Sequence, residues 1–308
     1  MHSPVTVIGE ALIDIVVRPH RSAQEHVGGS PLNVAVGLAR LGHPTQLATA
    51  LGQDERGDRI AQTLRESGVD LTPGSQTAAR TSTATAHLDA AGSATYEFEL
   101  SWDYRAGRGD LAVGAHLHTG SIAAILRPGA EQVAAAVDAH RGRGTVSYDP
   151  NVRPALMGSP EQARPIVEAM VARADVVKAS AEDAAWLYPH TPLPQVLADW
   201  ARLGPAIVAV TDGADATLVL VGGELSRWPP MPVTVIDTVG AGDAFMAGLL
   251  SGLVDGGFLG ATQARERLRF ARLEQLTAAI ERATTCAAIT VSRAGANPPF
   301  REELIVHS

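Results

Sequence analysis

Two glycines and a carboxylate stand within four residues at Gly240-Ala241-Gly242-Asp243, a spacing that could serve phosphoryl transfer. An apolar β-branched run at 233–236 precedes them and a long apolar stretch follows, which predicts a strand, a glycine turn and a helix. Glycines let several backbone N–H groups point at one anion at a helix N-terminus, where the helix dipole also favours negative charge. Asp243 would lie beside that anion and could accept a hydroxyl proton. The segment therefore predicts phosphorylation of an alcohol, the alternative being a glycine turn whose Asp only stabilises the helix.

A second constellation is Gly28-Gly29-Ser30-Pro31-Leu32-Asn33. Ser30 and Pro31 are typical of the N-cap and first residue of a helix, which the pattern continues to about residue 41. The two glycines allow close approach of a ligand to the backbone, and the Asn33 amide offers a donor and an acceptor that suit neighbouring sugar hydroxyls. The alternative is a plain helix start with Asn33 on a solvated face.

Polar residues also follow later strands. Asp149-Pro150-Asn151-Val152-Arg153 comes directly after a strand ending at Tyr148, and ligands bind at the carboxyl ends of strands in α/β sheets. A guanidinium there could neutralise a phosphate or a sugar acid.

The hydrophobic periodicity indicates the scaffold that would bring these motifs together. Strands are expected at 5–8, 12–17, 45–50, 116–119, 145–148, 175–178, 206–210 and 217–221, and a β-hairpin at 83–88 and 94–100. Helices are expected at 30–41, 54–67, 129–140, 160–173 and 194–203, and Ala-rich helices at 244–254 and 262–289. Such alternation predicts an α/β fold with a mostly parallel central sheet and helices on both faces.

The chain is expected to be a single domain over 1–308, with lid elements inserted at approximately 10–30 and 78–105. Such a small β lid could close over a substrate and exclude water, the alternative being an ordinary edge hairpin. An exposed face of a lid often pairs with its twin, so a homodimer through the lid is expected.

The composition bounds the function. The chain has 308 residues, of which 45% are hydrophobic and 19% charged, and its formal net charge of −8 argues against a nucleic-acid partner. Cys286 is the only cysteine, so no intrachain disulfide is possible. The sequence offers neither a signal peptide nor an apolar run long enough for a membrane span, so a cytoplasmic location without a membrane partner is expected.

Several motifs resemble those of one enzyme family. The string D-T-x-G-A-G-D-x-F from Asp237 to Phe245 resembles the signature of the ribokinase-like (PfkB-type) carbohydrate kinases, with every fixed position filled. G-G-x-x-x-N-x-A from Gly28 to Ala35 is similar to the family's first signature. The motifs cover nearly the whole chain in family order. D-P-N-x-R at 149–153, K-x-S at 178–180 and H-T-G-S at 118–121 are similar to the fructokinase-like subgroup.

The resemblance implies a ribokinase-like fold and roles for particular residues. It implies that Asp243 is the catalytic base and that the amides of Gly240, Ala241 and Gly242 hold the γ-phosphate of ATP. The residues implied to contact the sugar or its phosphate side are Asp14, Gly28, Gly29, Asn33, Asn151 and Arg153. Those implied to contact the nucleotide are Lys178, Thr211, Gly213 and Thr284, and an acid among Glu182 and Asp183 is implied to position Mg²⁺ through water.

The chain departs from the family pattern at a few of these places. Ser180 and Asp183 stand where the family usually shows Asn and Glu, which leaves open whether Glu182 or Asp183 serves the metal; both could instead act on the helix dipole. Thr284 falls where other members carry Asn or His. Many members bind K⁺, but the carbonyls around Asp237 and Gly295 exist in any sequence, so K⁺ dependence stays open.

Three hypotheses follow. The first is an ATP-dependent sugar kinase acting on fructose, and the second is the same chemistry on 2-keto-3-deoxygluconate, ribose or a nucleoside. A sugar acid would need a cation such as Arg80, Arg105 or Arg108, and Trp102 or Tyr104 could stack on a sugar or base. The third is a catalytically silent sugar- or nucleotide-binding regulator, against which the intact Asp243 argues. His116 and His118 are expected to be packing or substrate-edge residues rather than metal ligands.

Overall fold

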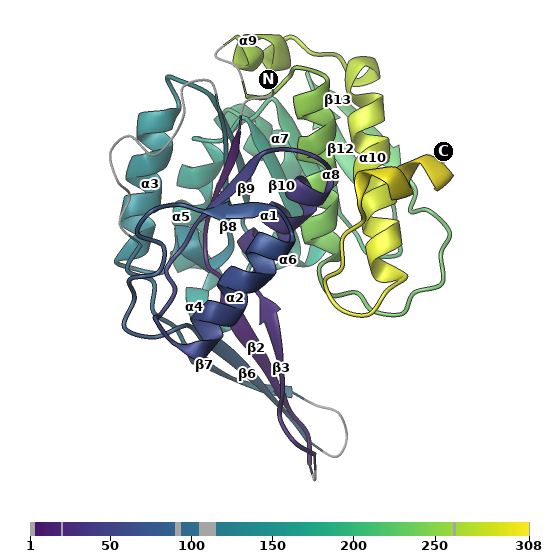
Figure 1. Ribbon diagram of the computed structural model, residues 1–308. Helices are drawn as coiled ribbons and strands as arrows, with labels where there is room; N and C mark the ends of the chain where they lie inside the picture. Colours follow the sequence, from purple (N-terminus) through teal and green to yellow (C-terminus); the bar gives the residue numbers. More distant parts are fainter. Residues whose placement is uncertain (1–3, 20, 90–93, 105–114, 261–262, 308) are drawn as a thin grey trace.

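The computed structural model describes residues 4–19, 21–89, 94–104, 115–260 and 263–307, which form two sheets of unequal size (Figure 1). The large sheet has nine strands in the order β13-β12-β11-β10-β9-β8-β1-β4-β5. Its strands are β1 (Val5–Ile8), β4 (Thr45–Ala48), β5 (Val69–Leu71), β8 (His116–Gly120), β9 (Thr145–Asp149), β10 (Val176–Ser180), β11 (Ile207–Thr211), β12 (Thr217–Val221) and β13 (Glu224–Trp228). Neighbouring strands from β5 to β11 pair in parallel, and β12 and β13 continue as antiparallel strands. The predicted mostly parallel α/β fold is confirmed.

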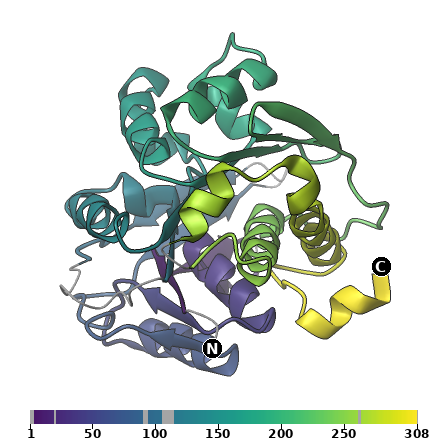
Figure 2. The same cartoon turned by 90° about the horizontal axis from the view of Figure 1, so that it is seen from above.

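Helices cover both faces of this sheet, because its strands are apolar on both sides. Neighbouring residues along one strand enter different cores: Val208 packs with one helix layer and Ala209 with the other. One layer contains α1 (Ser30–Arg40), α2 (Glu55–Glu66), α8 (Ala241–Asp255), α9 (Ala264–Arg269) and α10 (Leu273–Val291). The other contains α3 (Gly129–His140), α5 (Pro160–Val171), α6 (Ala181–Leu187) and α7 (Leu193–Leu203), with the short helix α4 (Pro154–Met157) nearby. Two 3₁₀ helices, η1 (Ser121–Ala124) and η2 (Arg301–His307), complete the described helices. Figure 2 shows α8 and α10 side by side on their face.

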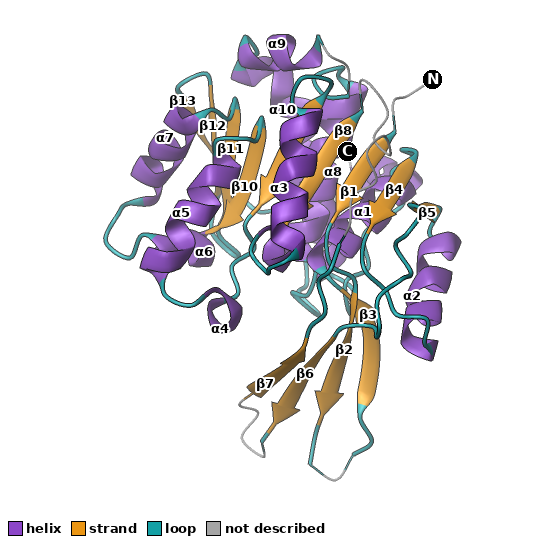
Figure 3. Ribbon diagram, turned by 90° about the vertical axis from the view of Figure 1, so that its left-hand side faces the viewer, coloured by secondary structure: helices purple, strands orange, loops and turns teal. Residues whose placement is uncertain are grey.

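The small sheet has four strands in the order β3-β2-β6-β7: β2 (Leu12–Val17), β3 (Gln24–Gly28), β6 (Thr83–Leu88) and β7 (Ala94–Glu99). Because β2 begins just after β1 ends, the small sheet projects from the carboxyl edge of the parallel strands (Figure 3). The register places Asp14 opposite His26 on one side and Ala84 on the other, and Ala84 opposite Phe98. These four side chains therefore share one face of the small sheet.

One expected strand is absent from the part of the chain that the structure describes. The apolar run 233–236 is a loop, and the N–H groups of Ile236 and Asp237 bond to the carbonyl of Val291 at the end of α10 instead of to a strand. Val235 and Ile236 are accordingly 60% and 65% exposed. Strands β3, β5 and β13 were not predicted, because they are short or polar edge strands without a full apolar alternation. Among the described residues, none of the helices is long and apolar enough to cross a membrane.

Candidate active site

The predicted anion site lies at the start of α8. Gly240 adopts a φ of 77°, in the left-handed region that favours glycine, and this sharp turn begins the helix. The first N–H groups of any helix lack acceptors within the helix and can serve an anion. Here the N–H of Ala241 donates to the carbonyl of Thr238 in the preceding turn at 3.3 Å. Asp237 stabilises the turn, because its carboxylate accepts N–H groups from Val239 at 3.0 Å and from Gly295 at 2.8 Å.

Asp243 stands in the first turn of α8, half-buried, with both carboxylate oxygens engaged. Its Oδ1 accepts a hydrogen bond from the Ser30 hydroxyl at 2.6 Å, and its Oδ2 accepts one from the Asn33 amide at 2.8 Å. The expected N-cap role of Ser30 is wrong: Gly29, with a φ of 112°, is the N-cap, and it makes no side-chain cap bond. The Ser30 hydroxyl is turned to Asp243 instead. The structure thus joins the two signature motifs at one carboxylate.

Asp14 faces the same site from β2. A Cβ placed on Gly28 would lie only 1.9 Å from Asp14 Oδ2, so a glycine at this position leaves room for the carboxylate. Desolvation raises the pKa of Asp14 and the nearby Asp243 carboxylate adds to this effect, whereas Arg153 and His26 counteract it. The charges of Arg153 and Asp243 therefore both act on the Asp14 carboxylate.

The loop that carries Arg153 is held in a strained conformation. Asn151 has a φ of 37°, unusual for a residue other than glycine. Its side-chain oxygen accepts a hydrogen bond from the Arg153 guanidinium at 2.9 Å. The buried carboxylate of Asp183 accepts the N–H of Val152 at 2.8 Å and that of Ser180 at 2.9 Å. Asp183 therefore ties the Asn151–Arg153 loop to the start of α6, while Glu182 in the same helical turn is exposed.

A buried ion pair lies beneath the amides of α8. Lys178 Nζ donates to Asp149 Oδ2 at 2.9 Å, and the two side chains are 5% and 1% exposed. A Cβ placed on Gly242 would lie 2.7 Å from Lys178 Nζ, so the ammonium lies directly against the anion site. Burial raises the pKa of Asp149 to about 6. Burial also works to lower the pKa of Lys178, but the carboxylates of Asp149, Asp243 and Asp183 together outweigh it and raise that pKa. At neutral pH the pair is ionised.

The residues predicted to contact the nucleotide come from three elements. Lys178 lies in β10, Thr211 ends β11 and Thr284 lies on α10. Gly213 follows β11 with a φ of 46°. The Thr284 hydroxyl donates to the carbonyls of Ile280 and Glu281 within its own helix. The exposed apolar loop at 231–239 runs past the same helix, where Met231 sulfur accepts a bond from the Thr285 hydroxyl.

Other predicted contributors lie elsewhere. Trp102 and Tyr104 do not reach the site: they are buried, stacked on each other, and the Trp102 indole donates to the carbonyl of Ala123. Arg80 pairs with Glu99 at 3.8 Å on the face of the small sheet opposite Asp14. Arg105 and Arg108 lie outside the described residues. His116 and His118 are buried and bond to Thr145 and Ser147 of the neighbouring strand, so the expectation that they pack is confirmed.

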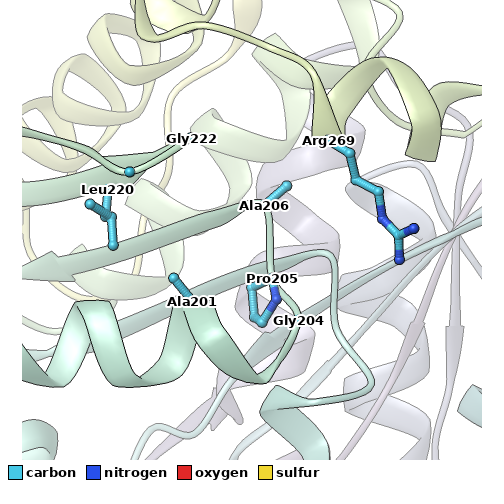
Figure 4. Close-up of a pocket in the computed structure, with 8 residues that line it drawn as sticks. Ala201, Gly204, Pro205, Ala206, Leu220, Gly222 and Arg269 are labelled. Carbon is cyan, nitrogen blue, oxygen red and sulfur yellow. The ribbon is translucent and has the colours of Figure 1, made fainter.

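The sequence analysis did not identify Glu10 as a buried acid near the site, nor His26 and Phe98 as neighbours of Asp14 on one face of the small sheet. Glu10 is 6% exposed at the end of β1, and its carboxylate accepts the N–H of Ala123 at 3.3 Å. An acid directly after a buried strand was the available signal. Figure 4 shows a hollow lined by Gly204, Pro205, Gly222 and Arg269. Gly204 and Pro205 come just before β11 and Gly222 just after the antiparallel β12, so the hollow lies at the opposite edge of the sheet from the site.

Comparison with known proteins agrees with this geometry. A family model described as pfkB family carbohydrate kinase matches residues 3–303. A curated fructokinase from Klebsiella pneumoniae is 33% identical over 314 residues, covering 99% of each chain. A crystal structure of fructokinase with bound ATP from Xylella fastidiosa has a TM-score of 0.85 at 26% identity and covers 100% of this chain and 99% of that one. A fructokinase double mutant from Vibrio cholerae O395 in fructose, ADP and potassium ion bound form has a TM-score of 0.83 at 29% identity, covering 99% of each.

The family model spans almost the whole chain, and the Klebsiella relative exceeds 30% identity over its full length. The expected ribokinase-like carbohydrate kinase is therefore confirmed. This chain belongs to the pfkB family of carbohydrate kinases.

Proposed function

We propose that this chain is a fructokinase that transfers the γ-phosphoryl group of ATP to a primary hydroxyl of fructose. The observation that carries the proposal is the Asp243 carboxylate, which stands at the N-terminus of α8 between the polar residues of the first signature and the Lys178 ammonium. Fructose is favoured over other sugars because the Klebsiella relative is named a fructokinase and the Vibrio structure is described with fructose and ADP bound.

The chemistry follows from where charge develops. The hydroxyl oxygen bonds to the γ-phosphorus as the bond to the β-phosphate oxygen breaks, and Asp243 accepts the hydroxyl proton. The amides of Gly240, Ala241 and Gly242 donate to the transferring group, a type of donor worth about 10²–10³ in rate. Lys178 adds a positive charge beneath them, held in place by Asp149. In a loose transition state the nucleophile's proton leaves late, so an ionised, well-placed carboxylate suffices as the base.

The sugar would be held between the two sheets. Asp14, Gly28, Gly29 and Asn33 would contact its hydroxyl groups, and Asn151 and Arg153 would lie on the phosphate side. The small sheet, inserted at approximately 10–30 and 78–105 in a single domain, would act as a lid that excludes water. Thr211, Gly213 and Thr284 would contact ATP, with the apolar loop at 231–239 covering the base.

The residues present fit a divalent cation carried by the nucleotide. Among the described residues no group of three or more His, Cys, Asp or Glu side chains could hold a metal, so Mg²⁺ would be bound through phosphate oxygens and water. When bound, Mg²⁺ would neutralise phosphate charge. Asp183 already accepts two N–H groups, which leaves Glu182 the less committed acid for the water shell. K⁺ near Asp237, Val239 and Gly295 is proposed from the potassium-bound Vibrio structure.

The remaining proposals concern the oligomeric state and the cellular location of the protein. The small sheet, on which Tyr96 is 61% exposed, would pair with a second copy in a homodimer. A cytoplasmic location fits substrates such as ATP.

An assay of ADP release with Mg-ATP tests the proposal. Fructose, 2-keto-3-deoxygluconate, ribose and adenosine are compared, with and without K⁺, beside Asp243→Ala. We expect turnover on fructose, abolished in the variant while ATP still binds, because a phosphoryl acceptor without its base is a poor nucleophile. Retention of a tenth of wild-type activity in Asp243→Ala would show that the base assignment is wrong. Turnover on another of these substrates would replace fructose, and ATP binding without any turnover would favour a silent regulator.

A further inference from the structure

We infer that Ser30 is a positioning residue that fixes the carboxylate of Asp243 before the sugar binds. The Ser30 hydroxyl donates to Asp243 Oδ1 at 2.6 Å across 213 residues of sequence, and the Ser30 residue is 8% exposed. Asn33 donates to the other oxygen at 2.8 Å. Two donors from one helical turn thus hold both oxygens of a carboxylate that belongs to another helix.

The Ser30 hydroxyl is not needed by its own helix. Ser at a helix start usually accepts an N–H group as the N-cap, but here Gly29 is the N-cap and Ser30 is the first residue of α1. Its proton is donated to Asp243. The function of the hydroxyl is therefore to be sought at the site.

The packing of α1 on α8 makes the bond rigid. A Cβ placed on Gly37 would lie 2.6 Å from the Cβ of Ala247, so the two helices approach more closely than a side chain at Gly37 would allow. Because both helices begin at the site, this close approach sets the separation between Ser30 and Asp243. The carboxylate is thereby preorganised, and small displacements of a reacting group cost rate steeply.

Other charged groups also act at Asp243, namely Asp14 from β2, Asp149 from β9 and Lys178 from β10. Ser30→Ala leaves all three in place, so a changed rate reports on the hydroxyl.

The test compares Ser30→Ala with Ser30→Thr, which keeps the hydroxyl, and with Ser159→Ala, the same change at the capping box of α5 far along the chain. This inference rests on the proposed role of Asp243 as base. For Ser30→Ala we expect a kcat about tenfold lower and a KM for the sugar within about twofold, since the loss of a hydrogen bond to a charged group corresponds to a factor of about ten or more. Ser30→Thr should recover part of the rate, and Ser159→Ala should change neither constant.

A second readout separates this inference from the choice of substrate. The ¹³Cγ signal of Asp243, identified as the carboxylate signal lost in Asp243→Asn, is recorded at one pH in the wild type, Ser30→Ala and Ser30→Thr without any sugar. A displaced signal in Ser30→Ala that Ser30→Thr restores supports the inference even if fructose is not turned over. An unchanged signal in Ser30→Ala, or a raised KM for the sugar with an unchanged kcat, would overturn it, because Ser30 would then be a structural or a sugar-binding residue.

Discussion

Glu10 makes the stability of this protein depend on pH in a direction opposite to that of most carboxylates. Burial at the end of β1 raises its pKa from 4.5 to about 7, although hydrogen bonds from Ser121 and Ala123 and the charge of Arg153 partly favour the ionised form. The folded protein therefore holds a proton on Glu10 that the unfolded chain has already released. The contribution of Glu10 to the free energy of unfolding is therefore most favourable below pH 4.5. It falls as the pH rises from 4.5 to about 7, and above pH 7 the whole contribution is lost.

The size of the effect follows from that pKa difference. At about 1.36 kcal/mol for each pH unit, the rise from 4.5 to about 7 corresponds to about 3 kcal/mol. Glu10→Gln replaces the carboxylate with a neutral group of the same shape. We expect the variant to be up to about 3 kcal/mol more stable than the wild type at pH 8 and nearly equal to it at pH 4.5.

Urea unfolding of both proteins between pH 4.5 and 8 measures this difference in the free energy of unfolding. The contributions of the other titrating groups are the same in both proteins and cancel in the difference. Glu224→Gln, at an exposed position on β13, serves as the matched control and should follow the wild type at every pH. Parallel curves for Glu10→Gln and wild type would show that Glu10 is ionised in the folded protein without cost, which would refute the reasoning from burial.

Two further predictions concern the anion site. Gly242→Ala should displace the Lys178 ammonium, 2.7 Å from the added methyl group, and lower kcat/KM for ATP about 100-fold. Gly142→Ala adds a methyl group that meets no atom within 4 Å and should leave kcat/KM unchanged. Equal kinetics in both variants would show that Lys178 does not act at the anion site. Asp149→Asn should lower the free energy of unfolding by about 3–5 kcal/mol, because it leaves a buried ammonium unpaired. The double variant Asp149→Asn/Lys178→Met should lose less than the sum of the two single variants in urea unfolding, and strict additivity would contradict the buried pair.

Local features of the sequence were enough to predict most elements. The alternation of strands and helices from about residue 115 onward predicted β8 to β12 and α3, α5 and α7 to within a few residues, because apolar periodicity reflects burial on a sheet or helix face. The hairpin of β6 and β7 was predicted for the same reason. The strand predicted at 233–236 was wrong, because β-branched residues also occur in exposed loops. The local sequence does not show which acceptor the backbone N–H groups bond to, which here is the carbonyl of Val291.

The sequence by itself determined which residue types were available for chemistry: glycines at a helix start, Asp243 in the first turn, and a Gly-Gly…Asn motif near the N-terminus. Only the tertiary structure decided what each side chain contacts. It turned Ser30 from an expected cap into a donor to Asp243, set Lys178 on Asp149 beneath Gly242, and turned the Asp183 carboxylate toward the Asn151–Arg153 loop. These contacts join residues brought together by the sheet and by the packing of α1 on α8, and such long-range distances are properties of the folded chain rather than of any local pattern.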